Sequence, residues 1–204
     1  MKKTILSLIM VAVMLTGSFA QEKRYEIESA ILKKSSVIMG QTISSTQYIA
    51  DYGMKESAES VISMQGMVLS LFTMMKDGYA YSANLTMKQG TKTNIAKVVG
   101  DYQNINYLNL TDDVKKQYQI EEKGNEQFLG KDCKSYKLTV TVQGQTVNAT
   151  ILVWQGLALK ATMDVLGTTV TEEVTEIQTG VNIPKEKFEL PEGIEFVEVN
   201  LPSL

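Results

Sequence analysis

The C-terminal half of the chain alternates apolar and polar residues with a period that suits only β-strands. From Tyr136 to Val165 apolar residues recur at every second position, with interruptions at Gln143-Gly144 and Gln155-Gly156. Successive side chains of a strand point to opposite faces, so each run can bury one face. A further turn at Gly167 leads into a last run that ends at Gln178. The segment 136–178 is therefore predicted to form a four-stranded antiparallel meander.

The last of these strands departs from strict alternation. Val170 and Val174 fall on one face, whereas Ile177 falls on the other. A β-bulge inserts one extra residue into a strand and shifts the alternation in this way. We therefore expect a bulge, or a frayed end, in the strand that follows Gly167.

The N-terminal half also favours strands, with a hairpin at Asp77-Gly78, and helix signals are confined to two segments. Thr111 is a suitable N-cap for a helix over 110–118, and a weaker helix is expected over 101–108. The tail 182–204 holds all three prolines and is expected to run irregularly over one edge of the sheet. The strands expected before residue 100 are 24–34, 41–52, 55–64, 68–76, 79–88 and 93–99.

The first twenty residues have the three parts of a secretory signal peptide. Residues 2–3 are lysines, 4–16 form an apolar run, and the small residues Ser18 and Ala20 precede the expected cut. The apolar run is too short to span a bilayer. We expect cleavage after Ala20 and a single domain over 21–204, in the periplasm or outside the cell. A retained membrane anchor is the alternative.

Two further features bear on the membrane. Ser18 follows Leu15-Thr16-Gly17, where a bacterial lipobox would carry its lipid-accepting cysteine. A hydroxyl cannot take the thioether-linked lipid, so we expect that the chain is not a lipoprotein. No second apolar run of 18 or more residues follows, which predicts no integral membrane segment in the mature chain.

Composition excludes several kinds of chemistry. The chain contains no histidine, which removes the usual catalytic triads and nearly all catalytic zinc sites. Adjacent carboxylates such as Glu121-Glu122 would point to opposite faces of a strand. The net charge of −3, which becomes −5 without the two leader lysines, disfavours nucleic acid as a partner. We expect no enzyme, no metal site and no cofactor.

Sulfur-containing residues leave some alternatives open. Cys133 is the only cysteine, so it is either a small buried residue or a reactive thiol. Methionines cluster between Met64 and Met87. They are consistent with ordinary core filling, with an adaptable lining for an apolar cavity, or with a thioether site for Cu(I).

Several segments, taken in order, resemble one known family. Two segments carry most of the resemblance. The first is Gly130-Lys131-Asp132-Cys133-Lys134-Ser135-Tyr136, and the second is the tail segment that contains Pro184, Phe188, Leu190, Pro191 and Gly193. Asp51-Tyr52-Gly53, Thr111-Asp112-Asp113-Val114-Lys115-Lys116 and Trp154-Gln155-Gly156 add to them. Their order and spacing, over most of 24–196, are similar to the LolA-like periplasmic proteins, especially those of Bacteroides-type bacteria.

This resemblance implies a mainly β fold with a minor α+β component. The sheet is expected to be strongly curved and antiparallel, an unclosed half-barrel with short helices over its concave side. In the outer-membrane lipoprotein carrier that side binds lipoprotein acyl chains, so the resemblance implies an apolar groove for a lipid or acyl chain. The carrier's N-terminal amphipathic helix has no counterpart here. Arg24 is the only arginine, and no functional residue of the family is carried over.

We therefore predict a non-enzymatic periplasmic carrier or binding module for a hydrophobic ligand. The alternative is an envelope interaction or scaffold protein whose core is filled and which takes no small molecule. The candidate groove residues share the apolar faces of the predicted strands. They are Leu138, Val140, Ile151, Val153, Leu159, Ala161 and Met163, with Met64, Met67 and Phe72 as looser additions.

Overall fold

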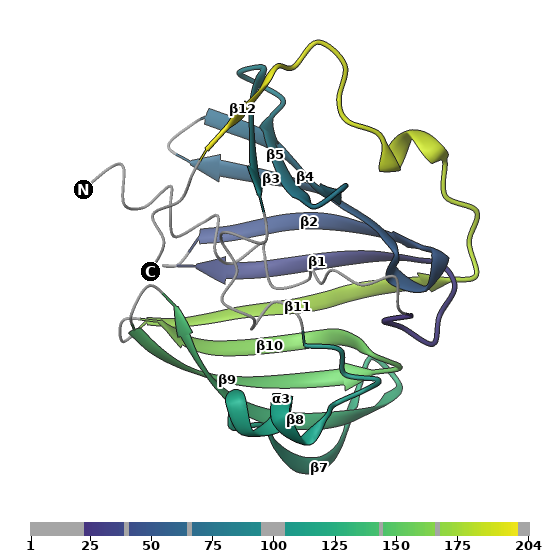
Figure 1. The fold of residues 1–204 in the computed structure, drawn as a ribbon, viewed down its shortest axis with the longest axis vertical. Helices are drawn as coiled ribbons and strands as arrows, with labels where there is room; N and C mark the ends of the chain where they lie inside the picture. The colour runs from purple at the N-terminus through teal and green to yellow at the C-terminus, as the bar shows by residue number, and fades with distance from the viewer. Residues whose placement is uncertain are drawn as a thin grey trace.

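The computed structural model describes residues 23–38, 41–64, 67–94, 105–142, 145–165 and 168–199. In this part of the chain one twelve-stranded sheet has the order β12-β6-β5-β4-β3-β2-β1-β11-β10-β9-β8-β7 (Figure 1). The sheet curves and does not close, because β12 and β7 stand at its two ends. The predicted mainly β half-barrel is confirmed. The expected signal peptide lies outside the described residues.

Two runs of antiparallel strands meet where β1 pairs with β11. The N-terminal run contains β1 (Ala30–Ile38), β2 (Gln41–Ala50), β3 (Lys55–Met64), β4 (Met67–Lys76), β5 (Tyr79–Asn84) and β6 (Gln89–Asn94). The C-terminal run contains β7 (Glu121–Phe128), β8 (Lys131–Val142), β9 (Gln145–Trp154), β10 (Leu157–Val165) and β11 (Thr168–Thr179). The short strand β12 (Phe196–Glu198) pairs in parallel with β6.

The predicted meander is confirmed as β8 to β11, in sequential order. The turn between β9 and β10 is a tight hairpin in which both residues of Gln155-Gly156 have positive φ. The hairpins at Leu129-Gly130 and Asp77-Gly78, elsewhere in the sheet, share this feature. Two-residue turns with positive φ match the twist of the strands that they join. The turns expected at Gln143-Gly144 and Gly167 lie outside the described residues.

Three β-bulges shift the register of the described sheet, and the one in β7 has Lys123 as its extra residue. Lys33 pairs with Glu176 and Lys34 with Val174, so Thr175 is the extra residue in β11, which confirms the expected bulge. In β10 the extra residue is Leu159, between the partners of Val153 and Leu152. This second bulge was not predicted, because apolar residues continue on both sides of it.

Some boundaries differ from the predictions. Residues 24–29 are not a strand but are hydrogen-bonded through their backbone to the connections at Tyr52 and Gln155, and β6 covers 89–94 instead of beginning at 93. Residues 85–88 form a turn between β5 and β6, and 105–108 do not form a helix. The remaining parts of the strand expected to end at 99 and of the helix expected from 101 lie outside the described residues.

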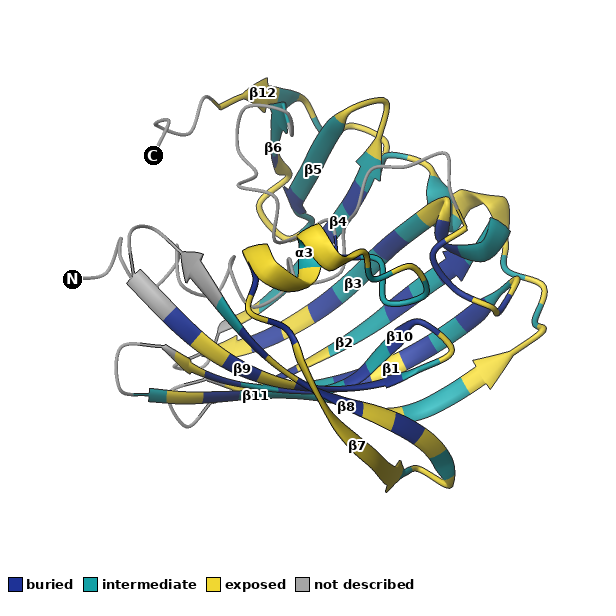
Figure 2. Cartoon of the chain, turned by 60° about the horizontal axis from the view of Figure 1, so that its bottom comes forward, coloured by how far each residue is buried: buried dark blue, intermediate teal, exposed yellow. Residues whose placement is uncertain are grey.

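The segment 105–120 lies over one face of the sheet, here called the inner face (Figure 2). It contains α3 (Asp112–Gln117), where Thr111 is the N-cap and its Oγ1 accepts a hydrogen bond from Val114 N at 3.3 Å. Acidic residues in the first turn and lysines in the last turn complement the helix dipole. The predicted helix is confirmed, as a short helix that covers the sheet.

The C-terminal tail covers the opposite, outer face of the N-terminal strands. It contains the 3-10 helix η3 (Lys185–Phe188), and a second 3-10 helix, η1 (Asp51–Gly53), follows β2. Ser57 Oγ donates a hydrogen bond to the carbonyl oxygen of Lys187. Leu190, Ile194 and Phe196 pack against a buried cluster formed by Phe72, Met74 and Ala83. The tail is irregular, as predicted, and it covers a face as well as an edge.

Candidate ligand-binding cavity

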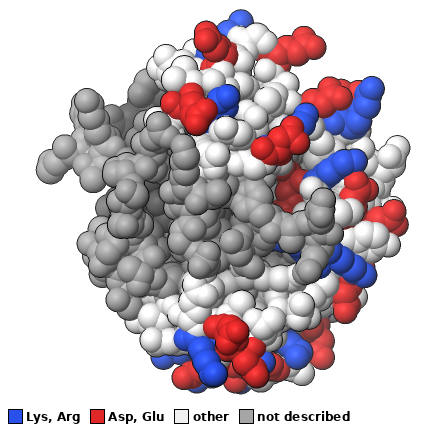
Figure 3. Space-filling model, in the orientation of Figure 1, with Lys and Arg blue, Asp and Glu red and all other residues white. Residues whose placement is uncertain are grey.

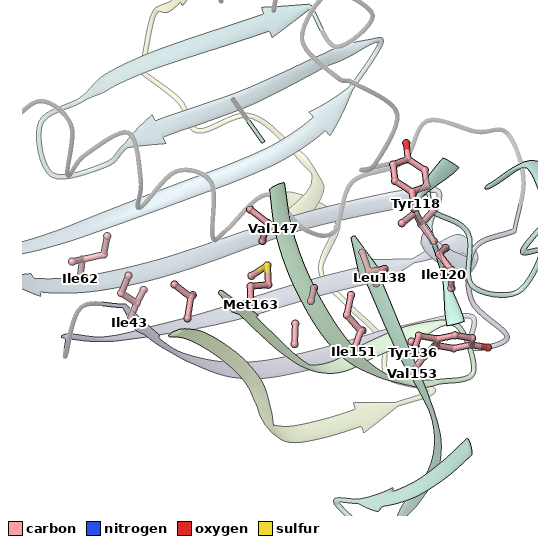
Figure 4. Close-up of a cluster of buried hydrophobic side chains, with 14 residues drawn as sticks. Ile43, Ile62, Tyr118, Ile120, Tyr136, Leu138, Val147, Ile151, Val153 and Met163 are labelled. Atoms are coloured by element: carbon pink, nitrogen blue, oxygen red, sulfur yellow. The ribbon is translucent and has the colours of Figure 1, made fainter. Parts of the chain in front are cut away.

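An apolar cluster occupies the inner face of the sheet (Figure 4). Its buried side chains come from β2, β3 and β8 to β11 and from the covering segment. Leu110, which precedes α3, and Val114, which lies within it, also pack against this cluster. The strand residues labelled in Figure 4 are Ile43, Ile62, Tyr136, Leu138, Val147, Ile151, Val153 and Met163.

A cavity of about 60 Å³ remains in this inner face. Strands β8 to β10 form its apolar wall, and β1, β2 and β11 contribute Leu32, Gln47 and Glu172. Two irregular segments cover it, through Arg24 and Tyr25 on one side and residues 105–107 on the other. Asn106 Nδ2 donates a hydrogen bond to the carbonyl oxygen of Lys23 at 3.2 Å and so ties the two segments together.

Five of the residues proposed from the sequence line this cavity. They are Leu138, Ile151, Leu159, Ala161 and Met163, all of them buried. Val153 is buried in the same cluster beside the cavity. The side chains of Val140, Met64 and Met67 lie outside the described part of the structure.

Phe72 is on the other face of the sheet. In β4 Leu69 and Leu71 pack toward the inner cluster, and the next residue, Phe72, therefore points outward. It is buried beneath the C-terminal tail. The cavity accordingly does not include Phe72.

A buried ionic cluster stands between the cavity and the N-terminal segment. The Arg24 guanidinium forms an ion pair with Glu56 Oε1, which also accepts a hydrogen bond from the Tyr25 hydroxyl at 3.0 Å. Gln47 Nε2 donates to Glu56 Oε2 at 2.7 Å. Burial raises the pKa of Glu56 above its ordinary value, although Arg24, Tyr25 and Gln47 all oppose that shift. Burial also raises the pKa of the Tyr25 phenol.

A second buried ion pair lies at the junction of the two runs of strands. Lys34 Nζ is 3.1 Å from Glu172 Oε1, and Ser36 Oγ donates to Glu172 Oε2 at 3.2 Å. Sequence reasoning missed these groups and the Arg24 cluster. The alternation of residues along β1 could have indicated them, because Lys34 and Ser36 share the face of the buried Ala30 and Leu32.

A second apolar cluster packs the N-terminal segment onto the sheet. It includes Tyr25, Ile27, Leu157 and Cys133. Cys133 is fully buried, and burial raises the pKa of its thiol. This environment is that of a small buried residue.

The described residues contain no group of three or more acidic or cysteine side chains that could hold a metal ion. No helix among them is both long enough and apolar enough to cross a membrane. Acidic and basic side chains are interspersed over the face of the molecule seen in Figure 3. No patch of a single charge stands out among the described residues on that face.

Comparison with known proteins supports the fold. No protein-family model matches the sequence, and no curated protein matches it. Among solved structures, a conserved protein from Thermus thermophilus superimposes with a TM-score of 0.56 at 11% identity, covering 95% of this chain and 99% of the other.

MucB is also similar. It superimposes with a TM-score of 0.51 at 13% identity, covering 91% of this chain and 63% of MucB, so the chain spans less than two thirds of that protein. A Vibrio parahaemolyticus domain, proposed to belong to an outer membrane lipoprotein-sorting protein, has a lower TM-score of 0.40 at 9% identity, over 81% of this chain and 91% of the domain. At these identities the likeness to the Thermus thermophilus protein and to MucB concerns the fold alone.

Proposed function

We propose that the protein is a non-enzymatic module that binds an apolar ligand on the inner face of its sheet, in the periplasm or outside the cell. The cavity carries this proposal: aliphatic side chains from β8, β9 and β10 line a space that the described residues leave empty. Each ligand methylene buried there would contribute about 0.8 kcal/mol. The signal-peptide pattern of residues 1–20 supports export.

The volume of the cavity defines what it holds without rearrangement. About 60 Å³ is room for a few methylene-sized groups. A longer acyl chain requires one of the two covering segments to move. The segment 24–28 is hydrogen-bonded to residues that connect strands of the sheet, since Arg24 N donates to Tyr52 O and Glu26 N donates to Gln155 O. Among the described residues the segment 105–109 is tied to the N-terminal segment by the side-chain hydrogen bond from Asn106 to Lys23 O, whereas its backbone hydrogen bond from Asn109 N to Asn106 O is internal. Because none of these bonds joins 105–109 to the sheet, we propose that the ligand enters there.

The test is uptake of an apolar ligand by the exported protein. Gently purified protein is examined by native mass spectrometry for lipid adducts and titrated with the fluorescent probe N-phenyl-1-naphthylamine. Adducts and saturable fluorescence are expected. Absence of both would refute the proposal.

A matched pair of variants locates the binding. Ala158→Phe places a ring at a half-buried position in the cavity wall and is expected to weaken probe binding at least tenfold. Ala80→Phe makes the same change at a half-buried position in β5 and should leave binding unchanged. Equal effects of the two substitutions would place the probe elsewhere.

A second function is favoured by the small size of the cavity. In this second function, the inner face is a filled hydrophobic core that takes no small molecule, and the protein acts as an envelope interaction or scaffold protein. MucB, which shares the fold, is seen in complex with MucA from Pseudomonas aeruginosa. A stoichiometric protein partner in pull-downs, together with no probe uptake, would support this function over ligand binding.

A further inference from the structure

The amide of Gln47 has a fixed orientation in the cavity wall. Gln47 is 4% exposed, and its Nε2 donates to Glu56 Oε2 at 2.7 Å. A carboxylate oxygen is an acceptor, so it is the NH₂ group that faces Glu56. The carbonyl oxygen Oε1 must then lie on the other side of the amide.

This carbonyl oxygen is unusual among the described residues. Gln47 Oε1 is enclosed and has no hydrogen-bond partner in the described part of the chain. Burying a carbonyl oxygen without a donor is unfavourable, and buried polar side chains in proteins are nearly always paired. Because Gln47 lines the cavity, a donor group on a ligand could satisfy it.

The charges around the cavity constrain the ligand further. Three charged residues line the cavity, and each one belongs to an ion pair: Arg24 with Glu56, Glu172 with Lys34, and Lys160 with Glu173. A charged ligand group would have to compete with one of these pairs. Burying an ion without its own counterion is costly. The charges that line the cavity are therefore balanced.

We propose that the cavity selects a neutral amphiphile whose head group donates a hydrogen bond to Gln47 Oε1, as a hydroxyl or a primary amide does. This inference rests on the proposed function. The alkyl part lies against Leu138, Ile151 and Met163, which line the apolar wall. Since Oε1 is enclosed, the head group reaches it as the ligand widens the cavity.

The test compares head groups on one alkyl chain. Decan-1-ol, decanamide, decyl methyl ether, decanoate and decylammonium each compete with N-phenyl-1-naphthylamine for the exported wild-type protein at pH 7. The alcohol and the amide, which can donate, are expected to bind about tenfold more tightly than the ether, which cannot. Both ions should bind more weakly than the alcohol.

Two outcomes would overturn the inference while leaving the proposed function intact. Equal affinity for the alcohol and the ether would mean that Gln47 Oε1 is satisfied by water only. Tighter binding of either ion would mean that the wall accepts charge. If no decyl compound displaces the probe and none forms an adduct, the proposed function fails as well.

A variant assigns the preference to Gln47. Gln47→Met keeps the length of the side chain and removes the carbonyl, so the affinities for alcohol and ether should become equal. Gln178→Met, at an exposed position of β11, should keep the tenfold preference. Thermal unfolding is recorded in parallel because Glu56 loses a donor in Gln47→Met. If that variant does not fold, the wild-type comparison of alcohol with ether decides alone.

Discussion

Lys34 and Glu172 form a buried ion pair, 3.1 Å from Nζ to Oε1, across the junction of β1 with β11. The neighbouring pair of Lys33 with Glu176, at 2.7 Å, joins the same strands on the outer face and is about half exposed. Two ion pairs that use adjacent residues of β1 thus differ mainly in burial. Comparing their contributions to stability therefore isolates the effect of burial.

Removing one partner of the buried pair should destabilise the fold strongly. Lys34→Met leaves Glu172 as an uncompensated buried charge and is expected to lower the free energy of unfolding by about 3–5 kcal/mol. Urea denaturation measures this change. Lys33→Met, the matched control on the exposed pair, should change the stability little, because water screens that pair. Similar losses in both variants would contradict the role assigned to burial.

The hairpin between β9 and β10 should tolerate a methyl group much less well than the hairpin before β8. Gly156 has φ +87°, and a Cβ there would stand 2.4 Å from the carbonyl oxygen of Arg24. Gly130 has φ +68° with open space around it. Gly130→Ala is expected to cost about 1 kcal/mol for the left-handed backbone, and Gly156→Ala several times more. Equal urea midpoints for the two variants would show that the N-terminal segment does not press on this turn.

Cys133 should be chemically inert in the folded protein. It is fully buried and burial raises the pKa of its thiol, so little reactive thiolate is available. Ellman's reagent is expected to give no reaction at pH 8 in buffer and complete reaction in concentrated urea. A cysteine placed in the exposed turn at Thr86, in a Cys133→Ala background, provides the reactive control. Rapid labelling of native Cys133 would contradict its buried environment.

Tyr25 should make the protein less stable at alkaline pH. Its pKa is raised in the folded state by burial, whereas an unfolded chain loses the phenolic proton near pH 10. The unfolded state therefore releases the proton first, so stability is complete below about pH 10 and declines as the pH rises further. Tyr25→Phe should flatten this decline between pH 9.5 and 11 in urea titrations, and an unchanged slope would refute it. Tyr107 and Tyr136, whose pKa values are also raised by burial, account for the decline that remains.

Phe72 should matter for stability but not for ligand uptake. It is buried on the outer face beneath the C-terminal tail. Phe72→Leu is expected to cost about 1 kcal/mol or more by leaving space around Met74 and Phe196. Affinity for N-phenyl-1-naphthylamine should stay at the wild-type value. A large loss of affinity at full folding would return Phe72 to the candidate site.

The strands that could be predicted are those with one buried face. β8 to β11 pack one face against the inner cluster, and the alternation of their residues records this. β7 escaped prediction because it is the last strand of the sheet and residues 121–127 are all exposed. In β4 the apolar residues are nearly continuous, since Leu71 faces the inner cluster and Phe72 the tail. Periodicity alone could not assign a face there.

The candidate site also contains residues that could be predicted from the sequence and others that could not. Leu138, Ile151 and Met163 could be found because they belong to regular strands that each present an apolar face. Gln47 shares the face of the buried Ile43 and Ile49 in β2, so alternation could have indicated it. Arg24 could not be predicted, because its position depends on an N-terminal segment that is hydrogen-bonded to Tyr52 and Gln155 instead of forming a strand. Contacts of this kind arise from tertiary packing and leave no periodic trace in the sequence.

The pairing of β1 with β11 brings Ala30 opposite Thr179, two residues that are far apart along the chain. When the chain emerges with its N-terminus first, the edge of β1 that pairs with β11 stays exposed until β11 has also emerged. Pairings between such distant residues form slowly, and an unpaired strand edge invites association with other chains. Pairing of β1 with β11 therefore removes one internal strand edge through which incompletely folded chains would associate.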